Sequence, residues 1–183
     1  MAVRIGASSH GFSNPTGFLS DCHRRIEMFL GALEAVAKAL DRPLAEGERK
    51  SLDAALRYFR ESAPKHNADE EESLFPRLRR IRDPQAQQAV EKLETLEREH
   101  RWAEPLHAEI DRLGQICLSG RELSAEAVRN FREAVSQLGA MYRTHIAAEE
   151  NVVFHAASLV LSAADQAAIA KEMEARRSLN KSD

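Results

Sequence analysis

Few residues of this chain could cross-link it or break a helix. Its 183 residues include only two cysteines, eight glycines and six prolines, and aromatic residues make up 5%. Cys22 and Cys117 lie far apart and outside any zinc-type spacing, which excludes a disulfide scaffold and a cysteine-based zinc site. We therefore expect two reduced thiols in the core of a cytoplasmic protein.

Long apolar runs and an excess of one charge are also missing. No stretch of about 18 apolar residues occurs, and residues 1–11 lack the apolar segment of a secretory signal, so no membrane span is expected. The net charge is −3 and the basic residues form no stripe, which argues against a nucleic-acid partner. With 43% apolar and 30% charged residues, the composition fits a single globular domain.

Helical periodicity, by contrast, is abundant. From Thr16 to Leu40 the apolar residues recur at spacings of three and four, which is the pattern of one buried helical stripe. The same pattern runs through residues 48–80 and 85–118 and continues from residue 124 to about 160, and no strand-like alternation competes. Four long amphipathic helices joined by short loops predict an all-α fold, an antiparallel up-down four-helix bundle.

Turn-forming residues divide the chain into three parts. Residues 1–15 are interpreted as an N-terminal arm, residues 16–160 as the bundle, and residues 161–183 as a short extra C-terminal helix with a polar tail. Pro64 and Pro105 lie inside the second and third predicted helices, where a proline removes a backbone donor and bends the axis.

The most informative pattern is a histidine followed four residues later by a glutamate, because it occurs twice. His66 and Glu70 form the first copy, and His145 and Glu149 form the second on a different predicted helix. Residues four apart lie one above the other on the same helix face. All four fall on the apolar seams of their helices, so we expect them to point into the core.

Two further histidines occupy matching heights on the remaining helices. His23 and His100 each lie about 18 residues before the end of their helix, and His66 lies about 18 residues after the start of its own. His145 follows the start of the fourth helix by about 21 residues. Because equal distances from a shared loop mean equal height in antiparallel packing, the four histidines should meet in one layer.

Such a layer would be costly without a cation. An unpaired buried carboxylate costs several kcal/mol, and the arginines of these helices lie off the seams. Neutral imidazoles and ionised carboxylates together suit iron, manganese, zinc or cobalt. Two octahedral metals would use four imidazoles, two bridging carboxylates and an oxo or hydroxo bridge and keep two positions open, whereas one metal would leave buried ligands unused. We therefore predict a dinuclear site.

These residues resemble those of hemerythrin-like proteins of the HHE cation-binding group. The resemblance covers residues 16–157 and rests on segments 21–27, 66–76, 99–100 and 145–154. It implies a non-haem di-iron site of two iron ions with an oxo or hydroxo bridge, in which zinc or manganese could substitute. By motif match, the terminal ligands are His23, His66, His100 and His145, and the bridging carboxylates are Glu70 and Glu149.

The sequence departs from the oxygen-carrying hemerythrins at two positions. Those proteins have a second histidine on the third helix, where this chain has Glu104, which we regard as an additional candidate ligand. Their last-helix carboxylate is an aspartate five residues after the histidine, whereas Glu149 follows His145 by four. The pattern is closer to family members linked to iron or oxygen sensing, or to repair of iron centres under nitrosative or oxidative stress.

Three functions remain open from the sequence. The first is a di-iron protein that binds or reacts with oxygen, nitric oxide or peroxide, with or without catalytic turnover. The second is a non-catalytic, metal-dependent sensor or interaction module. The third is a mononuclear structural cation site. Protein partners and oligomeric state are left open.

Several nearby residues have less certain roles in the sequence. His107, two turns after His100, could lie behind the ligands, gate a channel, or be an ordinary core or interface histidine. Tyr142 could donate to a bound oxygen species, although a core aromatic is the simpler interpretation. His155 is not expected to be a ligand. Three acidic residues are interpreted as solvated helix faces: Glu71, Glu72 and Glu150.

Overall fold

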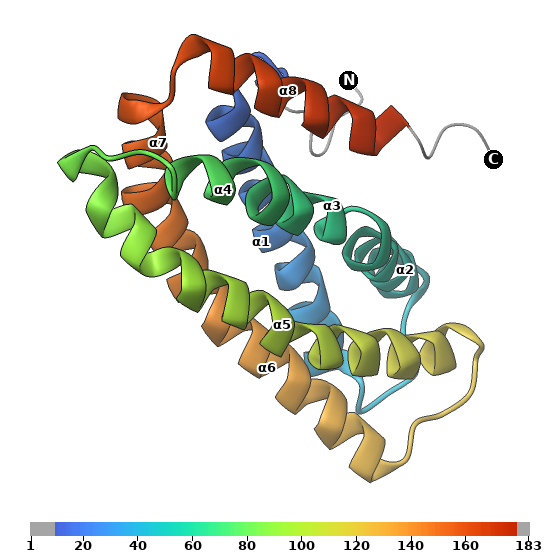
Figure 1. Cartoon of the computed structure of the whole chain (residues 1–183). Helices are drawn as coiled ribbons and strands as arrows, with labels where there is room; N and C mark the ends of the chain where they lie inside the picture. Colours follow the sequence, from blue (N-terminus) through green and yellow to red (C-terminus); the bar gives the residue numbers. More distant parts are fainter. Residues whose placement is uncertain (1–9, 179–183) are drawn as a thin grey trace.

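The computed structural model describes residues 10–178, and no strand occurs among them. The predicted all-α antiparallel bundle with an extra C-terminal helix is confirmed (Figure 1). The first and third arms of the bundle are the single helices α1 (Pro15–Ala39) and α5 (Pro84–Leu118). The second arm is α2 (Glu46–Glu61), α3 (Ala63–Ala68), η1 (Asp69–Leu74) and α4 (Phe75–Leu78). The fourth is α6 (Ala125–Ala148), η2 (Glu149–Phe154) and α7 (His155–Val160), followed by α8 (Ala163–Ser178).

The helices begin and end at residues whose chemistry favours those positions. The side chain of Asn14 accepts from the Gly17 amide at the start of α1, and Asp83 and Ser124 cap α5 and α6 in the same way. Helix α5 ends just before Gly120, whose φ of 80° is a conformation that glycine adopts without strain. Most of the predicted N-terminal arm lies outside the described residues.

The two prolines inside predicted helices act differently. The second arm is interrupted at Ser62, between α2 and α3, immediately before the segment that contains Pro64. The single helix predicted over residues 48–80 is therefore several consecutive pieces. Helix α5, in contrast, continues through Pro105 without interruption.

Both copies of the His-x-x-x-Glu pattern lead into a π turn, a feature that helical periodicity does not predict. Turn η1 begins at Asp69, one residue before Glu70, and η2 begins at Glu149. In the first turn the amide of Phe75 donates to the carbonyl of Glu70, five residues earlier. A π turn holds more residues than an α turn, so consecutive side chains fan over a narrower angle. Such turns are frequent at functional sites.

The apolar core is divided into two clusters. One lies toward the α2 end and includes Ile26, Ala63 and Tyr142. The other lies toward α4, α7 and α8 and includes Leu19 and Leu74, with further members on α5 and η2. On each arm the predicted histidine or glutamate falls between residues of the two clusters, so a polar layer crosses the bundle.

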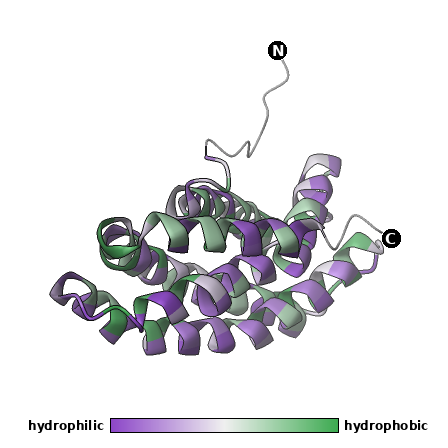
Figure 2. Cartoon of the chain, turned by 45° about the horizontal axis from the view of Figure 1, so that its top comes forward, coloured by the Kyte–Doolittle hydropathy of each residue, from purple (hydrophilic) through white to green (hydrophobic). Residues whose placement is uncertain are grey.

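Helix α8 lies across the end of the bundle that carries α4 and α7, beside the start of α1 (Figure 1). Its side chains Ile169 and Met173 are fully buried in the second apolar cluster. Along the bundle each helix carries a polar face and an apolar face (Figure 2). Within residues 10–178, no helix combines the length and the apolar character needed to cross a membrane.

Candidate metal centre

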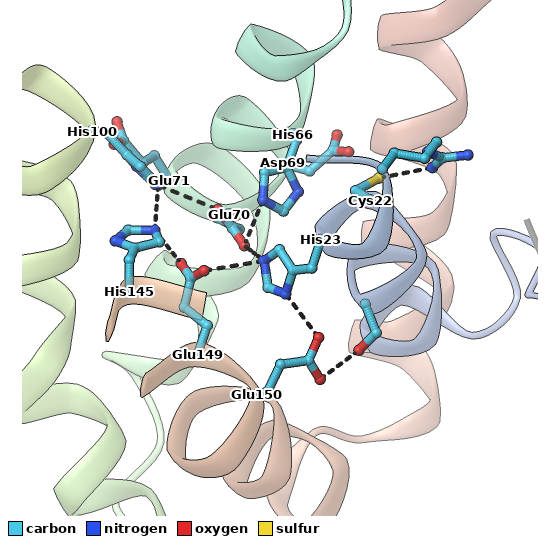
Figure 3. A network of polar contacts seen from close by, with 12 residues as sticks. Cys22, His23, His66, Asp69, Glu70, Glu71, His100, His145, Glu149 and Glu150 are labelled. Carbon is cyan, nitrogen blue, oxygen red and sulfur yellow. Dashed lines mark hydrogen bonds and ion pairs between the residues drawn. The ribbon is translucent and has the colours of Figure 1, made fainter. Parts of the chain in front are cut away.

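The polar layer contains the six side chains singled out from the sequence. All six are almost completely buried and point toward a common centre (Figure 3). Each of the four arms contributes at least one histidine, and the second and fourth arms also contribute a carboxylate. Exposed fractions are 2% for His23, His66 and His145, 4% for His100, and 0% for Glu70 and Glu149.

Glu149 lies between two histidines from different arms. Its Oε2 atom is 3.1 Å from Nε2 of His23 on α1, and its Oε1 atom is 3.1 Å from Nε2 of His145 on α6. One carboxylate therefore presents one oxygen to each side of the layer, which is the arrangement of a bridging ligand.

Glu70 divides its oxygens in the same way. Its Oε1 atom is 3.5 Å from Nε2 of His66 and 3.8 Å from Nε2 of His23, and its Oε2 atom is 3.6 Å from Nε2 of His100. The layer can thus be described as two overlapping groups of ligand atoms, each gathered within 4.8 Å. One group is His23, His66, Glu70 and Glu149, and the other is His100, His145 and Glu149.

Three glutamates outside the six hold the histidines from behind. Nδ1 of His23 lies 2.7 Å from Glu150, and Nδ1 of His100 lies 2.7 Å from Glu71. Nδ1 of His145 lies 2.8 Å from a third carboxylate, that of Glu99. A carboxylate on the far nitrogen fixes the orientation of a metal-binding imidazole and raises its basicity.

The interpretation of Glu71 and Glu150 as solvated helix faces was wrong. The side chains of Glu71 and Glu150 are half-buried, at 32% and 34% exposed. Each bonds a histidine of another arm. Each directly follows a glutamate of the layer, Glu70 or Glu149, and the narrower fan of side chains in a π turn lets both members of the pair reach the layer. Only Glu72 is exposed, as expected.

His100 and His145 show why the arrangement calls for a cation. Their Nε2 atoms lie 3.0 Å apart, while each Nδ1 faces a carboxylate, which can only accept a hydrogen bond when ionised. Neutral rings that donate from Nδ1 would bring two Nε2 lone pairs together. A proton or a metal ion must therefore lie between the two rings.

The carboxylates give a second, independent test of fit. Neither oxygen of Glu70 meets the geometry of a hydrogen bond within the described chain, and the oxygens of Glu149 have only the 3.1 Å contacts with Nε2 of His23 and His145, which pair the carboxylate when those rings are protonated. Buried carboxylate oxygens without donors are strongly destabilising unless a cation neutralises them. Imidazole nitrogens and carboxylate oxygens are the donors that iron, manganese and zinc accept, so the residues fit a divalent or trivalent metal.

The protonation states of the histidines and glutamates in the layer follow from their burial and from the charges of their neighbours. Burial and the carboxylate of Glu149 raise the pKa of Glu70 well above its ordinary value. Burial acts in the same direction on Glu149, but the adjacent His145 and His23 outweigh it and lower its pKa. Burial lowers the pKa of His23, yet Glu149 and Glu150 outweigh that effect and raise it to about 9. Burial lowers the pKa of His66, so His66 stays neutral. Without metal, the layer therefore holds protons that a metal would displace.

Residues with less certain predicted roles lie outside the layer. Glu104 is exposed on α5 and belongs to neither ligand group, so the structure does not bring this additional candidate into the site. His155 is also exposed. His107 stacks on Phe59, with ring centroids 4.8 Å apart, and its Nε2 lies 2.9 Å from the hydroxyl of Tyr142.

Comparison with known proteins agrees with this geometry. Residues 14–157 match the family described as Hemerythrin HHE cation binding domain. An uncharacterized protein from Haemophilus influenzae is 27% identical over 168 residues, which cover 91% of this chain and 91% of that protein. The family match includes the whole polar layer and ends before α8.

Proposed function

The chain belongs to the hemerythrin HHE cation binding domain family, and from that membership we propose that its polar layer binds two iron ions bridged by Glu70 and Glu149. The observation that carries the proposal is the division of each buried carboxylate between histidines of different arms. A single ion at either group would leave the other group's imidazoles and carboxylate oxygens buried without a partner. Zinc or manganese would fit the same donors.

We further propose that the loaded site binds or reacts with a small molecule such as oxygen, nitric oxide or peroxide. Bound iron would supply the redox and ligand-binding chemistry, and the protein would supply a closed, rigid layer around it. In this chain the layer is sealed on both sides by apolar clusters, which favours a small, weakly polar ligand over a larger substrate.

We propose that such a ligand approaches from the side of the bundle that carries His107, although the pocket there is not lined by any residue of the layer. A pocket of about 140 Å³ lies between α2 and α5 and is lined by Phe59 and His107, among others. Behind it, Tyr142 packs edge-on against His145, with ring centroids 6.3 Å apart. Burial raises the pKa of Tyr142 and lowers that of His107 to about 4, so the tyrosine hydroxyl donates to a neutral imidazole. The pair could also donate or accept one proton at the edge of the site.

Metal content and spectrum test the main proposal directly. The protein purified from iron-replete cells should contain about two irons per chain, with an absorption band of a bridged di-iron centre. Glu70→Ala should lose iron but remain helical, because the rest of the bundle is apolar. Glu104→Ala is a matched control, because this exposed glutamate should not affect iron content. Retention of two irons by Glu70→Ala would refute the bridging role.

A metal-dependent sensor or interaction module is the second candidate function. It is favoured by the position of the layer, because metal occupancy would decide whether the two apolar clusters are held together. In that case metal removal should change the melting temperature or the affinity for a partner, and no turnover should be detectable. A third outcome, one redox-inert metal per chain, would instead indicate a mononuclear structural site.

A further inference from the structure

Asp69, immediately before the bridging Glu70, is a buried acid that does not face the metal layer. Its side chain is 0% exposed and its carboxylate bonds two arginines of α8. Nη1 of Arg176 lies 2.9 Å from Oδ1, and Nη2 of Arg177 lies 2.6 Å from Oδ2. Nη1 of Arg177 adds a further bond of 3.2 Å to Oδ1. Hydrogen bonds between a guanidinium and a buried carboxylate are among the strongest in proteins.

Both guanidinium groups are themselves held in place. Arg176 donates to the hydroxyl of Ser73 at 2.8 Å and pairs with Glu72 at 3.1 Å, so it contacts η1 at three side chains. Arg177 donates to the Met173 carbonyl at 2.8 Å and lies over the ring of Phe18, 4.7 Å from its centroid. The two arginines are 19% and 23% exposed. We call Arg176, Arg177 and Asp69 the α8 clamp.

The second copy of the pattern provides an internal comparison. Aligning His66 with His145 and Glu70 with Glu149 places Asp69 opposite Ala148, and Ser73 opposite Val152. The acid and the hydroxyl that the arginines contact thus occur only in the copy that α8 covers. Helix α8 begins at Ala163, beyond the residues that match the family. The two arginines of the clamp therefore lie outside the part of the chain that matches the family.

The direction of the Glu70 side chain depends on the position of its own backbone. Neither of its carboxylate oxygens has a hydrogen-bond partner within the described chain, so its side chain is aimed by the backbone that carries it. That backbone is a π turn, a rare conformation that needs support from its surroundings. Fixing Asp69 fixes the first residue of the turn and, through one peptide unit, the Cα atom of Glu70.

We propose that Arg176 and Arg177 are positioning residues that hold Glu70 in bridging geometry by clamping Asp69 at the start of η1. The inference rests on the proposed metal-binding function for its consequence, but the clamp itself makes a prediction for the metal-free protein. Helix α8 thereby couples the C-terminal part of the chain to one bridging ligand and not to the other.

Hydrogen exchange on the metal-free protein tests the clamp alone. In the variant Arg176→Gln/Arg177→Gln, amides of η1 should exchange about tenfold faster or more, because several charge-assisted hydrogen bonds are lost. Amides of η2 should be unchanged, since Ala148 makes no equivalent contact. The control Arg112→Gln removes a guanidinium–carboxylate pair of 2.7 Å on α5, away from η1, and should leave η1 protected. Equal acceleration in η1 and η2, or none in either, would overturn the proposal.

Cobalt(II) binding, followed by its visible absorption, then separates positioning from simple stabilisation. The double arginine variant should bind cobalt about tenfold more weakly than the parent, as is typical when support behind a ligand is lost. Adding Asp69→Ala removes the unpaired buried carboxylate, so thermal stability should recover while cobalt affinity stays low. Recovery of both would mean that the arginines are merely structural.

The two proposals fail in different ways. A parent protein that binds no cobalt, zinc or iron would overturn the proposed function, whereas the exchange rates of η1 and η2 would still decide whether the clamp orders the turn. Normal cobalt affinity in the arginine variant would overturn the positioning role and leave the metal site intact.

Discussion

His100 and His145 face each other through their Nε2 atoms at 3.0 Å, although both rings are held from behind by a carboxylate. Two neutral imidazoles in these tautomers would repel, so the contact is stable only with a positive charge between the rings. The same reasoning applies to His23, whose Nε2 lies 3.1 Å from Glu149 while its Nδ1 faces Glu150. Proton and metal therefore compete for these positions, and the competition can be measured.

Metal uptake should release protons. In the metal-free layer the pKa of His23 is raised to about 9, so His23 carries a proton at pH 7, and the raised pKa of Glu70 favours its protonated form. Both groups must lose a proton to bind a metal, so affinity should fall as the pH falls. Zinc titration calorimetry in two buffers of different ionisation enthalpy should show protons released on loading, from His23, from Glu70 and from the contact between His100 and His145. A Glu150→Gln variant should release fewer, because His23 loses one of the groups that raise its pKa.

Chelation should destabilise the protein measurably. Metal binds the folded layer and not the dispersed ligands of the unfolded chain, so free metal at a thousand times the Kd should add about 4 kcal/mol to the free energy of unfolding. Thermal unfolding with and without a chelator measures the difference. A Glu149→Gln variant should show a much smaller change on chelation, since a neutral amide with one carbonyl oxygen is a poor bridge. An equal change in both proteins would contradict a bridging role for Glu149.

Loss of the carboxylate behind His145 should weaken the metal site without breaking the fold. Glu99 is 31% exposed and bonds Nδ1 of His145 at 2.8 Å, so Glu99→Gln removes a negative partner but keeps a hydrogen-bonding amide. Loss of such a partner typically costs 10–100-fold in metal affinity. Glu94→Gln is the control, because Glu94 lies on the same helix, is 79% exposed and pairs only with neighbouring residues of α5. Both variants should melt close to the parent when metal-free.

The two metal positions should also differ in affinity. Nδ1 of His66 has no hydrogen-bond partner, whereas His145 is backed by Glu99. We expect stepwise cobalt titration to show two binding events, with the tighter one at His100 and His145. In Glu99→Gln the two cobalt affinities should become more similar. A single binding event in the parent protein would contradict a difference in affinity between the two positions.

His107 should make stability depend on pH below neutrality. Burial lowers its pKa from 6.5 to about 4. Between those values the unfolded chain binds a proton that the folded chain does not, so stability falls as the pH falls from about 6.5 to about 4. The loss in the free energy of unfolding that is due to His107 reaches about 3 kcal/mol at pH values near its folded-state pKa. In His107→Gln, urea unfolding of the metal-free protein should show a shallower loss over this range, and an unchanged slope would contradict the prediction.

The long helices and the inward direction of six side chains could be predicted because each depends on periodicity within one helix. Seams that place His66 and Glu70 among leucines fix their direction whatever the neighbouring arm does. The π turns could not be predicted, because the α-helical spacing of the seam residues continues through both segments. Glu71 and Glu150 were interpreted as solvated for the same reason. On a regular α-helix, the residue that follows an inward-facing glutamate points away from the layer.

The contacts of α8 could not be predicted from the sequence for a different reason. Arg176 and Arg177 look like ordinary basic residues in the last turn of an exposed helix, and nothing in their spacing identifies Asp69 as their partner. Their separation from Asp69 is more than a hundred residues in sequence. Only the docking of Ile169 and Met173 in the second apolar cluster brings them to η1.

The division of the core by the polar layer has a consequence for cooperativity. Two apolar clusters separated by a layer of buried histidines and carboxylates should unfold less cooperatively when the layer holds no metal. Calorimetry of the stripped chain should then resolve two overlapping transitions, which merge into one when metal is restored. Bound metal would thus couple the unfolding of the two halves of the bundle.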